Sequence, residues 1–342
     1  MKLLLLLVVF TVLHVLFHDL TIWSSVTANV IGIDFASDSF KVAIVQPGTP
    51  LEIVNNFQSK RKTPTCITFY RGERMFGSDS YALMGRKPEL SFANIYRMIG
   101  RSIDHPAMKD FKKHYFPYEM YTNSTSGVSE LRVENTHYTP EELIAMLLQH
   151  IKEMTLSFGG KAIKDCVITV PSSFTQHERE AVYVAADIAD LKVLSLIEEN
   201  TAAALHYALD RTFDNVTNVM YFNMGAGSVQ VSIVAYSSAL VKEGGKNKTL
   251  GSFEVLSKAW DGSLGGFHFD VRLAELLADR FNENWSKKAS GKGKDLRDHL
   301  LPMTKLRLQA NKVKEILSAN NEFPVKAEQL HADVDLNTKV GR

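Results

Sequence analysis

The apolar positions of the chain change repeatedly between the spacing of strands and the spacing of helices. Apolar β-type runs occur at residues 29–45, where two of them flank a polar turn, and at residues 65–69, 166–170 and 192–197. A second hairpin pattern covers residues 219–236. Helical patterns lie between these strands, and such alternation is typical of α/β proteins. The pattern therefore predicts an α/β fold.

The strongest helix signal begins at Thr139. Thr139 and Glu142 have the spacing of a capping box, and Pro140 occupies the first helical position. The apolar face that follows consists of Leu143, Leu147, Ile151 and Met154. Thr175 and Glu178 open a second capped helix in the same way. Further helices are expected at residues 201–209, 267–284 and 306–318.

The first 28 residues are predicted not to belong to the fold. Lys2 precedes a mostly apolar run at residues 3–17, and Val26 and Ala28 occupy the −3 and −1 positions of a small-residue cleavage site. This pattern predicts a cleaved secretory signal and a mature chain that begins at Asn29. The run is shorter than the roughly 20 apolar residues of a membrane anchor. We therefore expect no membrane association after cleavage, with a signal anchor as the alternative.

Four glycosylation sequons support the secretory route. An Asn-X-Ser/Thr triplet marks an acceptor that is used only in secreted chains. The acceptor residues are Asn123, Asn215, Asn247 and Asn284.

Composition narrows the function classes that remain. A hydrophobic fraction of 45% with 23% charged residues is typical of a globular chain and excludes disorder and a multi-span membrane protein. The net charge of +1 gives no basic field for nucleic acid. The two cysteines, Cys66 and Cys166, cannot form a disulfide framework or a four-thiolate zinc site. Both lie in apolar runs, where buried free thiols are expected.

An internal repeat is the most informative feature of the sequence. Residues 29–45, NVIGIDFASDSFKVAIV, align with residues 218–234, NVMYFNMGAGSVQVSIV, with six identical positions and an offset of 189. Small residues in both turns would let backbone N–H groups approach phosphate oxygens. Asp34 at the end of its strand could orient a hydrated Mg²⁺ ion. The alternative is two unrelated hairpins that share β-propensity. The sequence contains no Walker-type phosphate loop.

Six collinear segments resemble the actin-like ATPase lobe of the seventy-kilodalton heat-shock (DnaK-like) chaperone family. They are residues 32–45, 164–182, 196–205, 222–234, 264–270 and 311–322. Asn200 and the LSAN run at 317–320 favour the large endoplasmic-reticulum branch of this family. The resemblance implies an α/β, actin-like ATPase fold with duplicated ribonuclease-H-like lobes that binds ATP or ADP with Mg²⁺.

The resemblance also assigns nucleotide-binding positions. Asp34 and Glu199 match the acidic residues that arrange Mg²⁺ and water, although Glu199 could equally be a surface carboxylate that caps the helix at Thr201. Ser37 matches the hydroxyl of the first phosphate loop. The remaining positions are Gly225, Gly227 and Ser228 in the second loop, Gly265 and Gly266 in a third glycine turn, and Lys314 and Ser318 at the adenosine.

Several residues depart from the family pattern. Tyr96 stands at the position of the catalytic lysine, Asn223 and Gln230 replace two aspartates, and Ala226 fills a glycine position. At the adenosine, Asn311 and Glu315 replace Glu and Arg. Phosphoryl transfer depends on positioned charge, so these losses should reduce hydrolysis more than binding. No residue is assigned a catalytic role.

The resemblance divides the chain into two lobes. Residues 29–212 form the first lobe, with an inserted subdomain at about 63–138, and residues 213–342 form part of the second. We expect this second lobe to be incomplete, to expose core surface, and to lack the substrate-binding domain that follows in the family. The whole protein would act in the lumen of the endoplasmic reticulum, hold unfolded polypeptides through the missing domain, and exchange nucleotide on the lumenal DnaK-like chaperone.

Two other functions fit the same sequence. One is an interaction module of ATPase-type fold that binds no nucleotide, which Tyr96, Asn223 and Gln230 favour. The other is an actin-like small-molecule kinase, which would need a catalytic carboxylate over a substrate hydroxyl, and the only candidates are Asp34 and Glu199.

Overall fold

The first lobe is built on a mixed β-sheet in the order β12-β11-β1-β2-β3. The computed structural model describes residues 29–342 except 47–49, 125–126, 210 and 244–245, so the predicted signal sequence lies outside the described residues. The sheet strands are β1 (Val30–Phe35), β2 (Ser39–Val45), β3 (Glu52–Ile53), β11 (Asp165–Val170) and β12 (Lys192–Glu198), and β4 (Thr63–Pro64) also pairs with β2. β1, β11 and β12 are parallel, so their carboxyl ends meet at one edge.

Two capped helices cover this sheet, as predicted. Helix α4 (Pro140–Gly159) begins with the capping box: the Thr139 amide donates to Glu142 Oε2 at 2.8 Å, and the Glu142 amide donates to Thr139 Oγ1 at 3.2 Å. Helix α5 (Gln176–Ile188) has the second box. All four residues of the predicted apolar face of α4 are buried in the core of the first lobe. The hydrogen bonds of these capping boxes thus determine where both helices begin.

The segment at about 63–138, where an inserted subdomain is expected, consists of short elements. One small sheet contains β5 (Cys66–Tyr70), β6 (Glu73–Phe76) and β7 (Ser91–Ala93), and another contains β8 (Met120–Thr122), β9 (Ser129–Val133) and β10 (Thr136–Tyr138). Helices α2 (Gly77–Met84) and α3 (Pro106–Lys113) and the 3-10 turns η1 (Pro88–Leu90) and η2 (Ile95–Arg97) connect them. Cys66 and Cys166 are buried free thiols, as expected, and burial raises the pKa of each to about 12.

His150 on α4 should make the stability of this region depend on pH. Its ring stacks on Phe76 with ring centres 4.8 Å apart, and burial lowers its pKa to about 4. The unfolded chain, in which His150 has the ordinary pKa of 6.5, binds the proton more tightly than the folded chain does. The free energy of unfolding should therefore fall by about 2 kcal/mol as the pH is lowered from 6.5 to 4. In denaturant titrations, His150→Phe should remove this part of the pH dependence. An unchanged profile would contradict the assignment.

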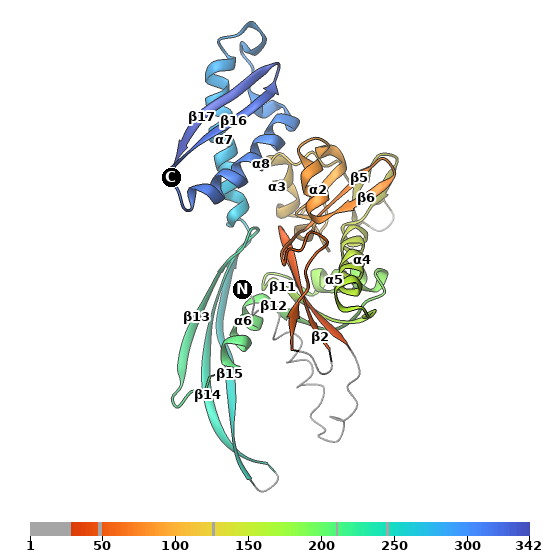
Figure 1. Ribbon diagram of the computed structural model, residues 1–342, viewed down its shortest axis with the longest axis vertical. Coiled ribbons are helices and arrows are strands. Elements are labelled where there is room, and N and C mark those ends of the chain that lie inside the picture. Colours follow the sequence, from red (N-terminus) through yellow and green to blue (C-terminus); the bar gives the residue numbers. More distant parts are fainter. Residues whose placement is uncertain (1–28, 47–49, 125–126, 210, 244–245) are drawn as a thin grey trace.

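The second lobe begins after helix α6 (Glu199–Ala208). Its first sheet has the order β13-β14-β15, with strands β13 (Thr217–Met224), β14 (Val229–Glu243) and β15 (Lys246–Asp261). Helices α7 (Gly266–Trp285) and α8 (Leu300–Leu317) and the hairpin β16 (Glu322–His331) and β17 (Val334–Gly341) pack into a separate core. In Figure 1 this group lies at the opposite end of the lobe from the long strands β14 and β15.

The two repeated hairpins have the same strand register. Val30 pairs with Val45 in the first hairpin, and Val219 pairs with Val234 in the second. These four positions are related by the same offset of 189. Likewise, the pair Asp34–Lys41 corresponds to the pair Asn223–Gln230. Equivalent residues therefore occupy equivalent places at the ends of both hairpins, which favours the repeat over unrelated strands.

One face of the β13-β14-β15 sheet is apolar and exposed. Met220 and Phe222 are 64% and 63% exposed, and Met224 and Ile233 are also exposed. The opposite face packs against α6 through Val234 and other buried residues. An exposed apolar surface is what the sequence predicts for the second lobe. Large exposed apolar patches usually mark a site that another segment or protein covers. Within the described residues, no helix is both long and apolar enough to cross a bilayer.

The two lobes meet in an aromatic seam. Phe267 and Val271 on α7 belong to the hydrophobic core of the first lobe. Phe116, which follows α3, packs against Phe267 with ring centres 5.3 Å apart, and the guanidinium of Arg307 on α8 lies 3.7 Å from the Phe116 ring centre. The contacts of this seam hold the two lobes together.

Candidate functional site

Asp34 and Glu199 are brought together at one edge of the first sheet. Asp34 lies near the carboxyl end of β1, and Glu199 is the first residue of α6, directly after β12. Because these strands are parallel, both carboxylates emerge at the same edge. Burial raises the pKa of both groups, and the charge of Asp34 contributes to raising the pKa of Glu199 to about 7. Two carboxylates that repel each other in a buried site suit a divalent cation.

Amide groups from the second hairpin hold the Glu199 carboxylate. Asn223 Nδ2 and Gln230 Nε2 both donate to Glu199 Oε2, at 2.9 and 2.8 Å. Gln230 Oε1 in turn accepts a hydrogen bond from the Ser172 amide at 2.8 Å. Glu199 is thus held by the opposite lobe, and the alternative of a surface helix cap is wrong: the N-cap residue of α6 is Glu198.

Asp34 is held by the neighbouring strand. Thr169 on β11 donates its hydroxyl hydrogen to Asp34 Oδ1 at 3.2 Å, and the same hydroxyl accepts from the Phe35 amide at 3.1 Å. The Thr169 carbonyl accepts a hydrogen bond from the Tyr96 hydroxyl at 3.0 Å. Tyr96 is only 2% exposed and packs edge-on against Phe35. The phenol is therefore a core group, and burial keeps its pKa well above the ordinary value.

The acidic pair fits Mg²⁺ only together with a phosphate ligand. Within the described ranges, no group of three or more His, Cys, Asp or Glu residues could hold a metal ion. Magnesium in nucleotide sites is held by one or two carboxylates, retained waters and substrate phosphates. Asp34 and Glu199 supply the carboxylates of such a set.

The three small-residue turns lie in direct contact. A Cβ atom added to Gly227 would lie 2.8 Å from Ser37 Oγ, so the first and second turns touch across the lobes. The Gly266 amide donates to the Gly225 carbonyl at 2.9 Å, and the Phe267 amide donates to the Ala226 carbonyl at 2.9 Å. Gly265 and Ser228 complete the contact between the second and third turns. Ser37, Gly225, Gly227, Ser228, Gly265 and Gly266, which were expected to bind phosphates, therefore lie close together, and their binding of phosphate stays a prediction.

Gly265→Ala should disrupt this contact. The new methyl group would lie 2.5 Å from the Ala226 carbonyl oxygen and 2.8 Å from the Ser228 amide nitrogen, and backbone atoms cannot move away cheaply. We expect a loss of about 1–3 kcal/mol in the free energy of unfolding and weaker nucleotide binding. Gly251→Ala serves as a control, because nothing lies within 4 Å of its added methyl group and its φ is not in the left-handed region. Equal nucleotide affinity in Gly265→Ala and wild type would contradict the assignment.

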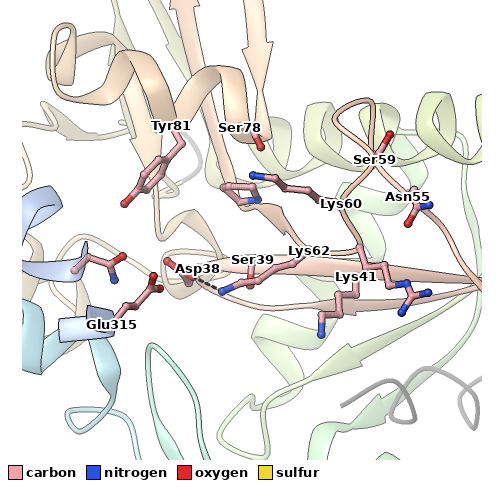
Figure 2. Close-up of a pocket in the computed structure, with 13 residues that line it drawn as sticks. Asp38, Ser39, Lys41, Asn55, Ser59, Lys60, Lys62, Ser78, Tyr81 and Glu315 are labelled. Atoms are coloured by element: carbon pink, nitrogen blue, oxygen red, sulfur yellow. Dashed lines mark ion pairs between the residues drawn. The ribbon is translucent and has the colours of Figure 1, made fainter. Parts of the chain in front are cut away.

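A cavity of about 780 Å³ lies beside the first turn. Asp38 and Ser39 from this turn, Tyr81 on α2, and Asn311 and Glu315 on α8 line one part of it. Figure 2 shows Asp38 with Tyr81 and Glu315 on one side and Lys62 on the other, and Asp38 forms an ion pair with Lys62 at 3.5 Å. The rest of the wall is basic and polar, with Lys41, Lys60, Arg61, Asn55 and Ser59 among its residues. Its size suits a nucleoside-sized ligand.

The predicted adenosine residues occupy the neighbourhood of this cavity without lining it. Lys314 forms an ion pair with Asp270 at 2.7 Å and donates to the Gly266 carbonyl at 3.1 Å. Ser318 donates its hydroxyl hydrogen to the Glu315 carbonyl at 2.6 Å. The wall on this side is formed by Asn311 and Glu315, the two positions where the sequence departs from the family.

Sequence analysis missed Arg97. This residue is 8% exposed, and its Cδ atom would lie 3.3 Å from a Cβ added to Gly227, beside Ser37. Its Nη2 donates to the Gly262 carbonyl at 3.3 Å. Arg97 therefore keeps a positive charge beside the phosphate turns, although the neighbouring Tyr96 cannot. Only its long-range position shows this, because an arginine in a short 3-10 turn carries no local signal.

The glycosylation sequons differ in their surroundings. Asn215 and Asn284 are exposed, the latter on α7. Asn123 is partly buried, and its side-chain amide donates to Glu130 at 2.6 Å. Asn247 lies on β15, and its side chain is outside the described part of the structure.

Comparisons with known proteins agree with this architecture. The family model described as "Hsp70 protein" matches residues 30–342. The chain is 38% identical to hypoxia up-regulated protein 1 of Danio rerio over 92% of its own length and 32% of that protein. For the Xenopus tropicalis and Homo sapiens proteins of the same name, identity is 38% and 37%, over 92% and 96% of this chain.

The chain spans between a third and a half of the length of these relatives, 48% in Xenopus tropicalis and 32% in Homo sapiens. The match to the family model nevertheless covers almost all of the described residues. The chain therefore belongs to the Hsp70 family and has its actin-like ATPase fold.

Proposed function

We propose that this chain binds ATP and ADP with Mg²⁺ between its lobes and hydrolyses ATP weakly or not at all. The observation that carries the proposal is the convergence of Asp34 and Glu199 beside turns from both lobes, with Ser37 against Gly227. Backbone N–H groups of small-residue turns bind phosphate oxygens, and the two carboxylates would hold the hydrated Mg²⁺. The adjacent cavity beside Asp38 and Asn311 would take the nucleoside.

Weak turnover follows from the same geometry. Tyr96 donates its hydroxyl hydrogen to the main chain and carries no charge toward the phosphates. Asn223 and Gln230 donate to Glu199 and add no negative charge that would hold cations or orient the attacking water. Arg97 remains as a cation near the turns and supports binding. Phosphoryl transfer needs several positioned charges at once, whereas binding needs fewer.

The whole protein would be a chaperone of the endoplasmic reticulum lumen. The predicted signal sequence and the sequons support this location. In this proposal it would bind unfolded polypeptides through segments outside this chain, assist folding under stress, and accelerate nucleotide exchange on the lumenal DnaK-like chaperone. The rate of nucleotide release from that chaperone, measured with and without the full-length protein, tests the last part; an unchanged rate would refute it.

Calorimetric titration of residues 29–342 with ATP and ADP, with and without Mg²⁺, tests the nucleotide site. A cooperative melt is checked first, so that absent binding is not confused with an unfolded chain. We expect saturable binding that is stronger with Mg²⁺. A folded chain without binding would refute the proposal.

A second candidate is an interaction module of the same fold that binds no nucleotide. The observation that favours it is that the two amides already satisfy Glu199 Oε2 without any cation. The calorimetric titration separates the two functions directly.

A further inference from the structure

Two histidines face each other at the seam between the lobes. His114 follows α3 in the first lobe, and His268 lies in the first turn of α7 in the second. Their ring centres are 5.4 Å apart, and their planes are almost perpendicular, at 85°. Neither ring belongs to the proposed nucleotide site.

Three nitrogen atoms of this pair lack partners. Nδ1 of His114 and both ring nitrogens of His268 are buried and make no hydrogen bond within the described part of the chain. The Gly265 backbone lies close enough to His268 to raise the pKa of the ring slightly. The two groups are not aligned for a hydrogen bond, so both ring nitrogens stay without a partner. A buried polar atom without a partner is destabilising, so three such atoms in one place indicate that a ligand completes the site.

Both rings are held in the neutral form. Burial and, to a smaller extent, the neighbouring His268 lower the pKa of His114 to about 4. Burial and the charge of Arg97 lower the pKa of His268. A neutral imidazole has a free lone pair, which is the form that binds metal ions.

A cavity of about 450 Å³ gives access to the pair from solvent. His114, His268, Ser263 and Glu275 are among the residues that line it. Two nearby cations are already paired: Lys113 with Asp110 at 3.5 Å, and Arg272 with Glu275 at 3.3 Å. Arg97 and Arg307 also act on His114 and would weaken, but not prevent, the binding of a cation.

The spacing of the rings matches metal coordination. Two imidazoles on one tetrahedral zinc ion, with Zn–N bonds of about 2.0–2.1 Å, have ring centres about 5 Å apart. The observed 5.4 Å lies near this value. No third His, Cys, Asp or Glu among the described residues completes the set. Two positions of a tetrahedral ion would remain for water from the cavity, one more than in open zinc sites with three protein ligands.

We propose that His114 and His268 together bind one zinc-type divalent ion, which links the two lobes across the seam. Each lobe supplies one ligand, so the ion holds them in the arrangement in which the seam is closed. The site is separate from the carboxylates that face the nucleotide.

The test is calorimetric titration of the full chain with Zn²⁺, with Asp34→Asn titrated alongside so that any ion held by the carboxylates is recognised separately. We expect about one equivalent of zinc to bind with a dissociation constant in the micromolar range, and to raise the melting temperature because it binds only the folded chain. His114→Phe and His268→Phe should each weaken binding at least tenfold and remove the melting shift. Phenylalanine suits both positions because both rings already pack against Phe267.

A second histidine pair provides the matched control. The ring centres of His299 and His331 lie 4.2 Å apart with their planes tilted by 33°, which is too close for two imidazoles on one tetrahedral ion. His331→Phe should therefore leave zinc binding unchanged. If either seam variant fails to melt cooperatively, its glutamine counterpart replaces it. Zinc binding that persists in both seam variants, disappears in His331→Phe, or is absent in the wild type would overturn the proposal.

Discussion

Asp34→Asn should weaken Mg²⁺-dependent ATP binding by about 30–100-fold, which corresponds to about 2–3 kcal/mol. The substitution removes one of the two carboxylates that would hold the ion through water. It preserves the shape of the side chain, and its Oδ1 can still accept the Thr169 hydrogen bond seen at 3.2 Å. Calorimetry with ATP, with and without Mg²⁺, measures the change.

The same variant should not be less stable than the wild type. Burial raises the pKa of Asp34, so its charge disfavours the folded state at neutral pH, and the neutral amide relieves that penalty. Asp165→Asn is the matched control. Asp165 lies on the adjacent strand β11 and pairs with Val30 at the opposite end of β1. Equal losses of affinity in both variants would contradict the proposed Mg²⁺ position.

The combined variant Tyr96→Lys/Asn223→Asp/Gln230→Asp should raise ATP turnover at least tenfold over the wild type. All three positions converge on Glu199: the two amides donate to it, and Tyr96 lies close enough for Glu199 and Asp34 to raise its pKa. The new ammonium group would stabilise negative charge on the transferring phosphoryl group, and single preorganised donors of this kind change rates by about 100-fold or more. Release of phosphate in single-turnover experiments measures the gain.

The three changes should succeed only together. Asn223→Asp or Gln230→Asp alone adds a carboxylate beside the already crowded Glu199 and should destabilise the chain without a gain in turnover. Tyr96→Phe is the control for the phenol, because it removes only the hydrogen bond to Thr169 and should lower stability by about 1 kcal/mol. If Tyr96→Phe lowered turnover, the hydroxyl would have a part in the chemistry that this structure does not assign to it.

Features with a local cause could be predicted from the sequence. The capping boxes at Thr139 and Thr175 depend on residues three positions apart, and both form as expected. The repeated hairpins follow from alternating apolar residues, and the shared register places Asp34 and Asn223 at equivalent ends. The predicted helix at 306–318 was too short, because α8 begins at Leu300 and accommodates Pro302 in its first turn, where the missing amide has no helical partner.

Features that depend on residues far apart in the chain could not be predicted from the sequence. Three such contacts join residues that are between 44 and 165 positions apart. They are the ion pair between Lys314 and Asp270 and the hydrogen bonds between Arg97 and Gly262 and between Gln230 and Ser172. Glu199 could be read equally well as a helix cap, since its amide partners lie on a hairpin of the other lobe. The short elements between residues 71 and 138 also lacked a signal, because strands of three to five residues are too brief to establish a period.

The common register of the two hairpins shows how the copies of this motif have come to differ. At the same structural position, the first copy presents the carboxylate of Asp34, whereas the second presents the amide of Asn223. Its cross-strand neighbour is a lysine in the first copy and Gln230 in the second. The first hairpin thus carries the carboxylate of the proposed Mg²⁺ site, and the second carries neutral amides that donate hydrogen bonds to Glu199. Two hairpins with one backbone geometry therefore differ in charge at their ends: the first holds an acid and a base across its strands, and the second holds two amides.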